Sequence, residues 1–163
     1  MTAAQIQYDL LPGVGVGSIL LGMTRVEAIL AMQADAAKNQ SKVEVWIDEP
    51  HDWYPHRTEK LFMHESCFQV AMTDDGPVDS IEICGNSPKG WAEDRKLPVD
   101  VSYDDLWLLS TPATMLIEHF RRQDVAAGGT DASFPSLGLE FWRSDESARY
   151  FETVRVFEPR SLA

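Results

Sequence analysis

Two segments in which apolar and polar residues alternate, joined by a turn sequence, constrain the fold of this chain more than any other feature. Apolar side chains occupy every second position of residues 68–72, Asp-Asp-Gly-Pro follows at 74–77, and a second alternating segment runs over 78–83. This pattern is typical of a β-hairpin that buries one face and exposes the other. It therefore predicts an antiparallel sheet that needs a second layer to cover its apolar face.

The pattern also predicts the register of this hairpin. Pairing Val70 with Ile81 places the large apolar residues of both strands on one face. A shift by one residue pairs Val70 with Ser80 and moves half of these residues to the other face. We therefore expect the pairs Val70–Ile81 and Phe68–Ile83, closed by a loop over 74–77 because Pro77 has no backbone N–H.

Two helix starts are visible, one in each half of the chain. Thr24 followed by Glu27 forms a capping box, and the apolar periodicity behind it predicts a helix over 24–38. Thr111 before Pro112 predicts a second start, with Thr111 as the N-cap, in a helix that ends before Gly128-Gly129. The predicted buried residues are Val26, Ile29, Leu30, Ala34 and Ala37 in the first helix, and Ala113, Leu116, Ile117 and Phe120 in the second.

Further strands are predicted at 42–47, 137–142 and 150–157, so each helix precedes an antiparallel strand pair. We therefore predict an α+β fold in which two helix-plus-hairpin halves share one antiparallel sheet, with the helices packed on one face. At 163 residues the chain is expected to form a single domain over 1–163. Its pseudo-halves are about 13–85 and 100–158, joined by a polar linker at about 86–99.

The charge of the chain excludes one class of partner. With 26 Asp and Glu against 14 Lys and Arg, the net charge is -12, which repels nucleic-acid phosphates and favours a basic protein partner. Residues 1–7 lack a basic region, and no apolar run approaches the length of a membrane span. The two cysteines, Cys67 and Cys84, are expected to lie side by side in the hairpin as free thiols. We therefore expect a protein of the reducing cytoplasm that does not bind membranes.

Two patterns suggest ligand binding, and each has a structural alternative. The glycines at 13, 15 and 17 suggest a dinucleotide loop, but the predicted helix starts too far downstream, so a lead-in to a strand is favoured. His51, His56, His64 and Cys67 suggest a metal site, but zinc needs a second closely spaced pair of ligands, so loop histidines are favoured. We expect neither cofactor nor metal. A small enzyme or ligand-binding domain that uses the Gly13–Gly17 or His51–His64 loop remains the alternative function.

The stretch at 48–54 combines acidic and aromatic residues in a predicted loop. This composition is typical of protein-binding hot spots, because large rings and charges on a loop can reach into a partner. The alternative is that Trp53 or Tyr54 packs into the core. The predicted partner-binding residues are Asp48, Glu49, Asp52, Trp53 and Tyr54.

Four stretches together resemble small uncharacterised bacterial proteins, some of which look like immunity proteins of polymorphic toxin systems. They are residues 17–28 (GSILLGMTRVEA), the hairpin at 68–83, residues 110–113 (STPA), and 137–143 (LGLEFWR) with 150–154 (YFETV). The resemblance carries no catalytic residue. It implies a cytoplasmic immunity protein, not an enzyme, that binds and occludes a cognate toxin domain of basic charge.

Overall fold

The computed structural model of the chain describes residues 5–85, 99–121, 126–128 and 131–159. Of these residues 17% are helical and 42% lie in strands, so the fold is mostly β and the predicted α+β class is wrong. The predicted linker at 86–99 lies outside the described residues except for Val99, which begins a strand.

Eight of the strands in the described part form one large antiparallel sheet, and each helix is followed along the chain by four of them. The two groups of four are joined where the last strand, β13, pairs with β7. The sheet is therefore continuous from one half of the chain to the other. Its order is β10 (Ala126–Gly128), β11 (Asp131–Phe134), β12 (Leu139–Trp142), β13 (Thr153–Phe157), β7 (Val78–Cys84), β6 (Phe68–Thr73), β5 (Thr58–Met63), β4 (Glu44–Asp48).

A smaller sheet accounts for much of the error in the predicted class. Its central pair is β1 with β8, which run parallel although they come from opposite halves of the chain. Three of its strands have only two residues each, too few to show any periodicity in a sequence. Its order is β3 (Ile19–Leu20), β2 (Gly15–Val16), β1 (Ile6–Leu11), β8 (Val99–Tyr103), β9 (Leu106–Trp107).

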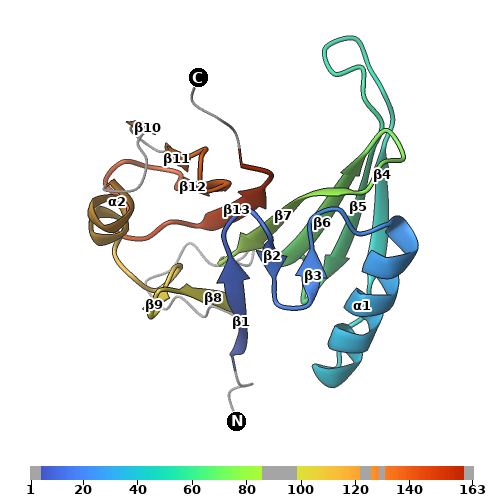
Figure 1. Cartoon of the computed structure of the whole chain (residues 1–163), viewed down its shortest axis with the longest axis horizontal. Helices are drawn as coiled ribbons and strands as arrows, with labels where there is room; N and C mark the ends of the chain where they lie inside the picture. The colour runs from blue at the N-terminus through green and yellow to red at the C-terminus, as the bar shows by residue number, and fades with distance from the viewer. Residues whose placement is uncertain (1–4, 86–98, 122–125, 129–130, 160–163) are drawn as a thin grey trace.

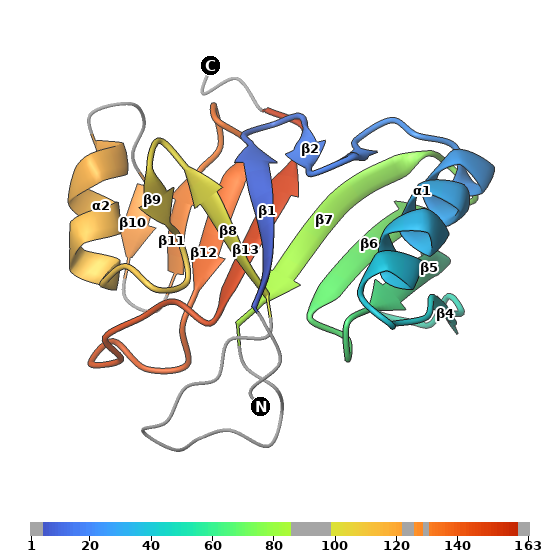
Figure 2. The same ribbon diagram turned by 90° about the horizontal axis from the view of Figure 1, so that it is seen from below.

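The layers leave one face of the large sheet open. The helices α1 (Arg25–Lys38) and α2 (Ala113–Arg121) lie on the same side of it, at opposite ends, and the small sheet lies between them (Figures 1 and 2). The core fills the space between these layers. It is built from apolar side chains of the covered face, among them Val70, Ile81 and Val156, which are fully buried.

The predicted hairpin register is confirmed. Val70 pairs with Ile81 and Phe68 with Ile83, and an irregularity after Ala71 shifts the last pair of the ladder. The turn is built by the two residues 74 and 75, which both adopt the left-handed conformation, with φ of 51° and 58°. Both central residues of a type I′ turn require positive φ, and aspartate tolerates this conformation better than most residues.

The first helix begins where predicted, but it buries a different face. Thr24 caps it, since the Thr24 hydroxyl oxygen accepts a hydrogen bond from the Glu27 N–H at 3.2 Å. Val26 and Leu30, which the periodicity placed in the core, are 63% and 61% exposed. Apolar residues occur on both sides of this helix, so spacing alone did not identify the packed side. The buried residues are instead Ala28, Met32 and Ala36.

The second helix begins two residues after the predicted cap, at Ala113. The carbonyl of Pro112 accepts the N–H of Leu116 at 3.2 Å, so the prediction that Thr111 is the N-cap is wrong. The N–H of Ala113 is satisfied from outside the helix, by the carbonyl of Arg149 at 2.8 Å. Leu116 and Phe120 are buried as predicted.

Candidate functional site

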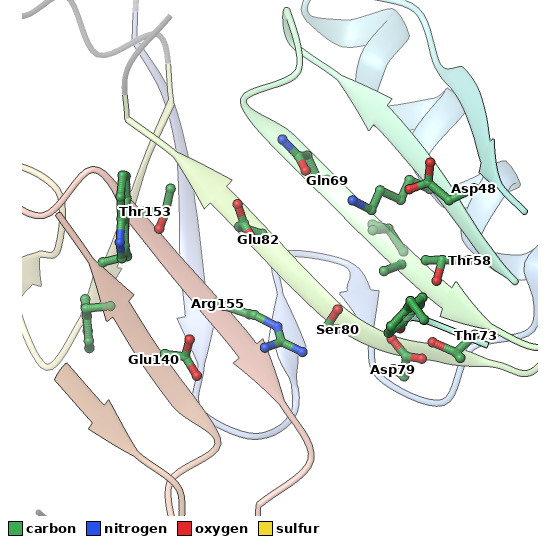
Figure 3. Close-up of a pocket in the computed structure, with 16 residues that line it drawn as sticks. Asp48, Thr58, Gln69, Thr73, Asp79, Ser80, Glu82, Glu140, Thr153 and Arg155 are labelled. Carbon is green, nitrogen blue, oxygen red and sulfur yellow. The ribbon is translucent and has the colours of Figure 1, made fainter. Parts of the chain in front are cut away.

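The open face of the large sheet carries a groove of about 540 Å³. Its floor is the set of side chains that point away from the core on five neighbouring strands, β12, β13, β7, β6 and β5 (Figure 3). Because antiparallel partners point to the same face, the strand registers place residues from both halves of the chain in one row. That row runs Glu140, Arg155, Glu82, Gln69.

Acidic groups outnumber basic ones along this groove. Carboxylates line it at Asp48, Asp79, Glu82 and Glu140, and cations at Lys60 and Arg155. Arg155 stands directly between Glu82 and Glu140 in the ladder, and Figure 3 shows its side chain extending towards Ser80. The remaining carboxylates are spread over several strands, which makes the groove an elongated negative surface rather than a single ion site.

Aromatic rings border the two ends of the groove. Trp142 lines it from β12, and Tyr54 lines it from the segment that joins β4 to β5. Trp46, on β4, is also exposed. Aromatic residues are enriched at the energetic centres of protein interfaces, where they give large contact areas, whereas most charged groups lie at the rim.

The segment 49–57 between β4 and β5 forms a projecting loop, seen as the long teal excursion in Figure 1. His51 and Tyr54 form an isolated antiparallel bridge, with backbone N–H···O distances of 3.0 Å in both directions. Trp53 lies at the tip and is 88% exposed, with its ring edge-on to His51 at 5.4 Å. Tyr54 is also exposed, so the alternative that these two rings pack into the core is wrong.

The base of this loop is tied to the β6–β7 turn. His56 Nδ1 lies 2.7 Å from Asp74 Oδ2, and Arg57 Nη1 donates to Asp75 Oδ1 at 2.5 Å. The hydrogen bond from His56, followed by one from the Arg57 N–H, lowers the pKa of the Asp74 carboxyl. These contacts hold the loop at a defined position beside the groove.

The five predicted partner-binding residues therefore divide into two groups. Asp48 and Tyr54 line the groove. Glu49, Asp52 and Trp53 are exposed on the projecting loop, and Glu49 Oε1 lies 3.7 Å from Arg57 Nε. The loop residues were accessible to sequence reasoning because they are contiguous. The residues on β7, β12 and β13 were not, because only strand pairing brings them together.

The glycines at 13, 15 and 17 have structural roles. A Cβ added to Gly15 would lie 2.3 Å from the Ile19 carbonyl oxygen, and one added to Gly17 would lie 2.8 Å from the Tyr8 ring. Gly17 also requires a positive φ of 58°. The chain thus folds tightly on itself here, and β3 separates these glycines from α1, so the geometry of a phosphate-binding loop is lacking.

The residues of the metal-like pattern, His51, His56, His64 and Cys67, are not assembled into one site. His51 and His56 belong to the projecting loop, whereas His64 is buried, with its Nε2 2.7 Å from the hydroxyl of Tyr8. Burial lowers the pKa of His64, and this effect exceeds the opposing influence of Asp35, which also bonds Tyr8. Within the described ranges there is no group of three or more metal-ligating side chains.

The two cysteines are free thiols, with Cys67 directly before β6 and Cys84 at the end of the neighbouring strand β7. The N–H of Cys84 donates to the carbonyl of Cys67 at 2.8 Å. Cys67 is buried, and its burial raises the thiol pKa to about 11. A thiol with so high a pKa is a poor nucleophile near neutral pH, because the thiolate is the reactive form.

No family model, curated protein or solved structure matches this chain. In the part of the chain that the structure describes, neither helix has the length and apolar character to cross a bilayer. The assignment of function therefore depends on the groove and the loop themselves.

Proposed function

We propose that this protein is a cytoplasmic immunity protein that binds a basic toxin domain and occludes its active site. The observation that carries the proposal is the juxtaposition of an acidic groove with a projecting aromatic loop on the uncovered face of the large sheet. Both features suit a partner whose own cleft is positively charged.

Electrostatics would govern how fast the partner arrives. A net charge of -12 creates a field that accelerates the approach of a basic domain, and the carboxylates of the groove direct it to one face. Charges at the rim of such an interface act mainly on the association rate, which falls as salt screens them.

The exposed rings would govern how long the complex lasts. Trp53 lies between the bridged residues His51 and Tyr54 and is almost fully exposed, so it could enter a cleft that the flat sheet cannot enter. Burying an exposed tryptophan removes a large apolar area from water, so this contact would act mainly on the dissociation rate. Occlusion of this kind needs no catalytic group in the inhibitor.

The test is to search for a toxin-domain gene adjacent to its own, to co-express the two genes, and to measure binding kinetics with the purified partner. We expect Glu140→Lys to slow association and to weaken its salt dependence, and Trp53→Ala to accelerate dissociation. Glu146→Lys changes the net charge equally on an exposed turn that does not line the groove, so it serves as the matched control. A wild-type protein that neither binds nor protects overturns the proposal, and equal effects of both charge variants overturn the role of the groove.

A further inference from the structure

The strand β4 forms one edge of the large sheet, and within the described residues no strand pairs with its outer side. It carries three consecutive exposed apolar side chains: Val45, Trp46 and Ile47, which are 49%, 59% and 43% exposed. Natural edge strands are usually protected by charges, prolines or bulges, because a row of free N–H and C=O groups pairs readily with another strand. The centre of β4 has none of these protections.

The free backbone N–H and C=O groups of β4 can be satisfied by another β-strand. If that strand is β4 of a second copy, symmetry restricts how the two strands can pair. Two copies of an edge strand pair antiparallel about a two-fold axis perpendicular to the sheet, which keeps each side chain on its own face. Paired residues must then point to the same face, so their numbers add to an even sum. Only a few registers centred on β4 satisfy this condition.

Charge selects one of these registers. Pairing centred on Trp46 places Glu44 of each copy opposite Asp48 of the other, which gives two pairs of like charges. Pairing centred on Glu44 places the two Glu44 carboxylates opposite each other. Pairing about Asp48 places the two Asp48 carboxylates together, and pairing about Ile47 places Asp48 opposite Trp46. Pairing about Val45, with the paired segment extended two residues beyond the start of β4, instead places Lys42 opposite Asp48 of the second copy at both ends of the strand pair. Like charges directly opposite each other destabilise a ladder, and opposite charges stabilise it.

The same register also matches the apolar side chains. On the face that α1 covers, Val45 meets Val45, and Val43 meets Ile47 of the second copy. Since α1 contacts β5, the α1 helices of the two copies would lie about three strand spacings apart, about 14 Å, with these side chains between them. The two projecting loops would be separated by about eight residues of strand, about 27 Å, so they do not collide.

We propose that this protein forms a two-fold symmetric dimer through antiparallel pairing of β4 with β4, in the register centred on Val45. The inference does not rest on the proposed function, because it is argued from the unpaired backbone edge of β4, although Asp48 of this strand also lines the groove. The dimer would join the two large sheets into one, with both grooves on the same side.

Sedimentation velocity from about 1 to 200 µM tests the proposal directly. We expect a monomer–dimer equilibrium for the wild type and a monomer for Val45→Lys, which places two ammonium groups opposite each other on the axis. Val26→Lys makes the same change at an exposed apolar position of α1 and should leave the equilibrium unaltered. Circular dichroism establishes that both variants fold.

Charge reversal tests the register. Lys42→Glu and Asp48→Lys each replace two attractive charge pairs by repulsive ones. Each variant should raise the dissociation constant of the dimer by at least about 2- to 30-fold. The double variant restores both pairs with their signs exchanged and should recover wild-type affinity. A wild type that stays monomeric at 200 µM overturns the proposal, even if the edge accepts a strand from another protein. A dimer that is insensitive to Val45→Lys overturns it equally, and a double variant weaker than both single variants overturns the register.

Discussion

Replacing Phe120 by alanine should remove the main anchor of α2. The ring is fully buried, with its centroid 5.2 Å from that of Phe134, 5.6 Å from Phe141 and stacked at 5.8 Å on Tyr103. Truncating a buried phenylalanine costs about 3–5 kcal/mol, and aromatic pairs add about 0.5–1.5 kcal/mol each. Because the ring contacts three aromatic neighbours, we expect a loss in the free energy of unfolding near the upper end, about 4–5 kcal/mol.

Equilibrium unfolding in urea, followed by tryptophan fluorescence, measures this loss. Met115→Ala is the matched control, since Met115 is on the same helix but 58% exposed, and surface changes of this kind cost about 0.5 kcal/mol or less. Phe120→Leu keeps most of the apolar volume and should fall between the two. A loss below about 2 kcal/mol for Phe120→Ala, with an unchanged m-value, would refute the view that this cluster holds α2 on the sheet.

Three further outcomes follow from local geometry. Thr24→Ala should lower the free energy of unfolding by about 1 kcal/mol in the same urea assay, because the cap of α1 is lost. Gly138→Ala should lower the free energy of unfolding by more than about 1 kcal/mol, because Gly138 has a φ of 69° and the new Cβ would lie 2.1 Å from the Phe157 carbonyl oxygen. Burial raises the pKa of Cys67 from 9.0 to about 11, so the unfolded state loses this proton first, and stability should fall as pH rises from about 9 to 11. Two pKa units correspond to at most about 3 kcal/mol. Cys67→Ala should reduce this alkaline slope in urea titrations at several pH values, and the remaining slope comes in part from Cys84, whose pKa is also raised by burial.

Local signals predicted the elements that local forces determine. The hairpin around residues 74–77 and the start of α1 depend on residues close together in sequence, and both were predicted correctly. The parallel pairing of β1 with β8 joins positions such as Ile6 and Val99, and no local pattern encodes it. Because this pairing and the short strands β2 and β9 were not predicted, the fold was wrongly assigned to the α+β class.

The candidate site likewise has one part that was predicted from the sequence, the projecting loop, and one part that was not, the groove. The projecting loop was identified from the composition of a contiguous stretch, and the structure places its rings in solvent. The groove depends on Arg155 standing between Glu82 and Glu140, which requires both the β13–β7 register and the β12–β13 register. On α1, apolar residues on two sides made the periodicity ambiguous, and packing against the sheet decided which side is buried.

The pairing of β13 with β7 has a consequence for synthesis of the chain. The strand β7 ends at Cys84 and its partner begins at Thr153, so about 70 residues must be translated before the large sheet is continuous. At about 5–20 residues per second this takes about 4–14 s. During that interval the first half has an unpaired edge at β7 as well as at β4, and β1 lacks β8 until Tyr103 has been translated, which is about the first quarter of the interval. The nascent chain is therefore most prone to aggregation before its second half emerges, and variants that slow pairing of β13 should lower the soluble yield more than their effect on equilibrium stability predicts.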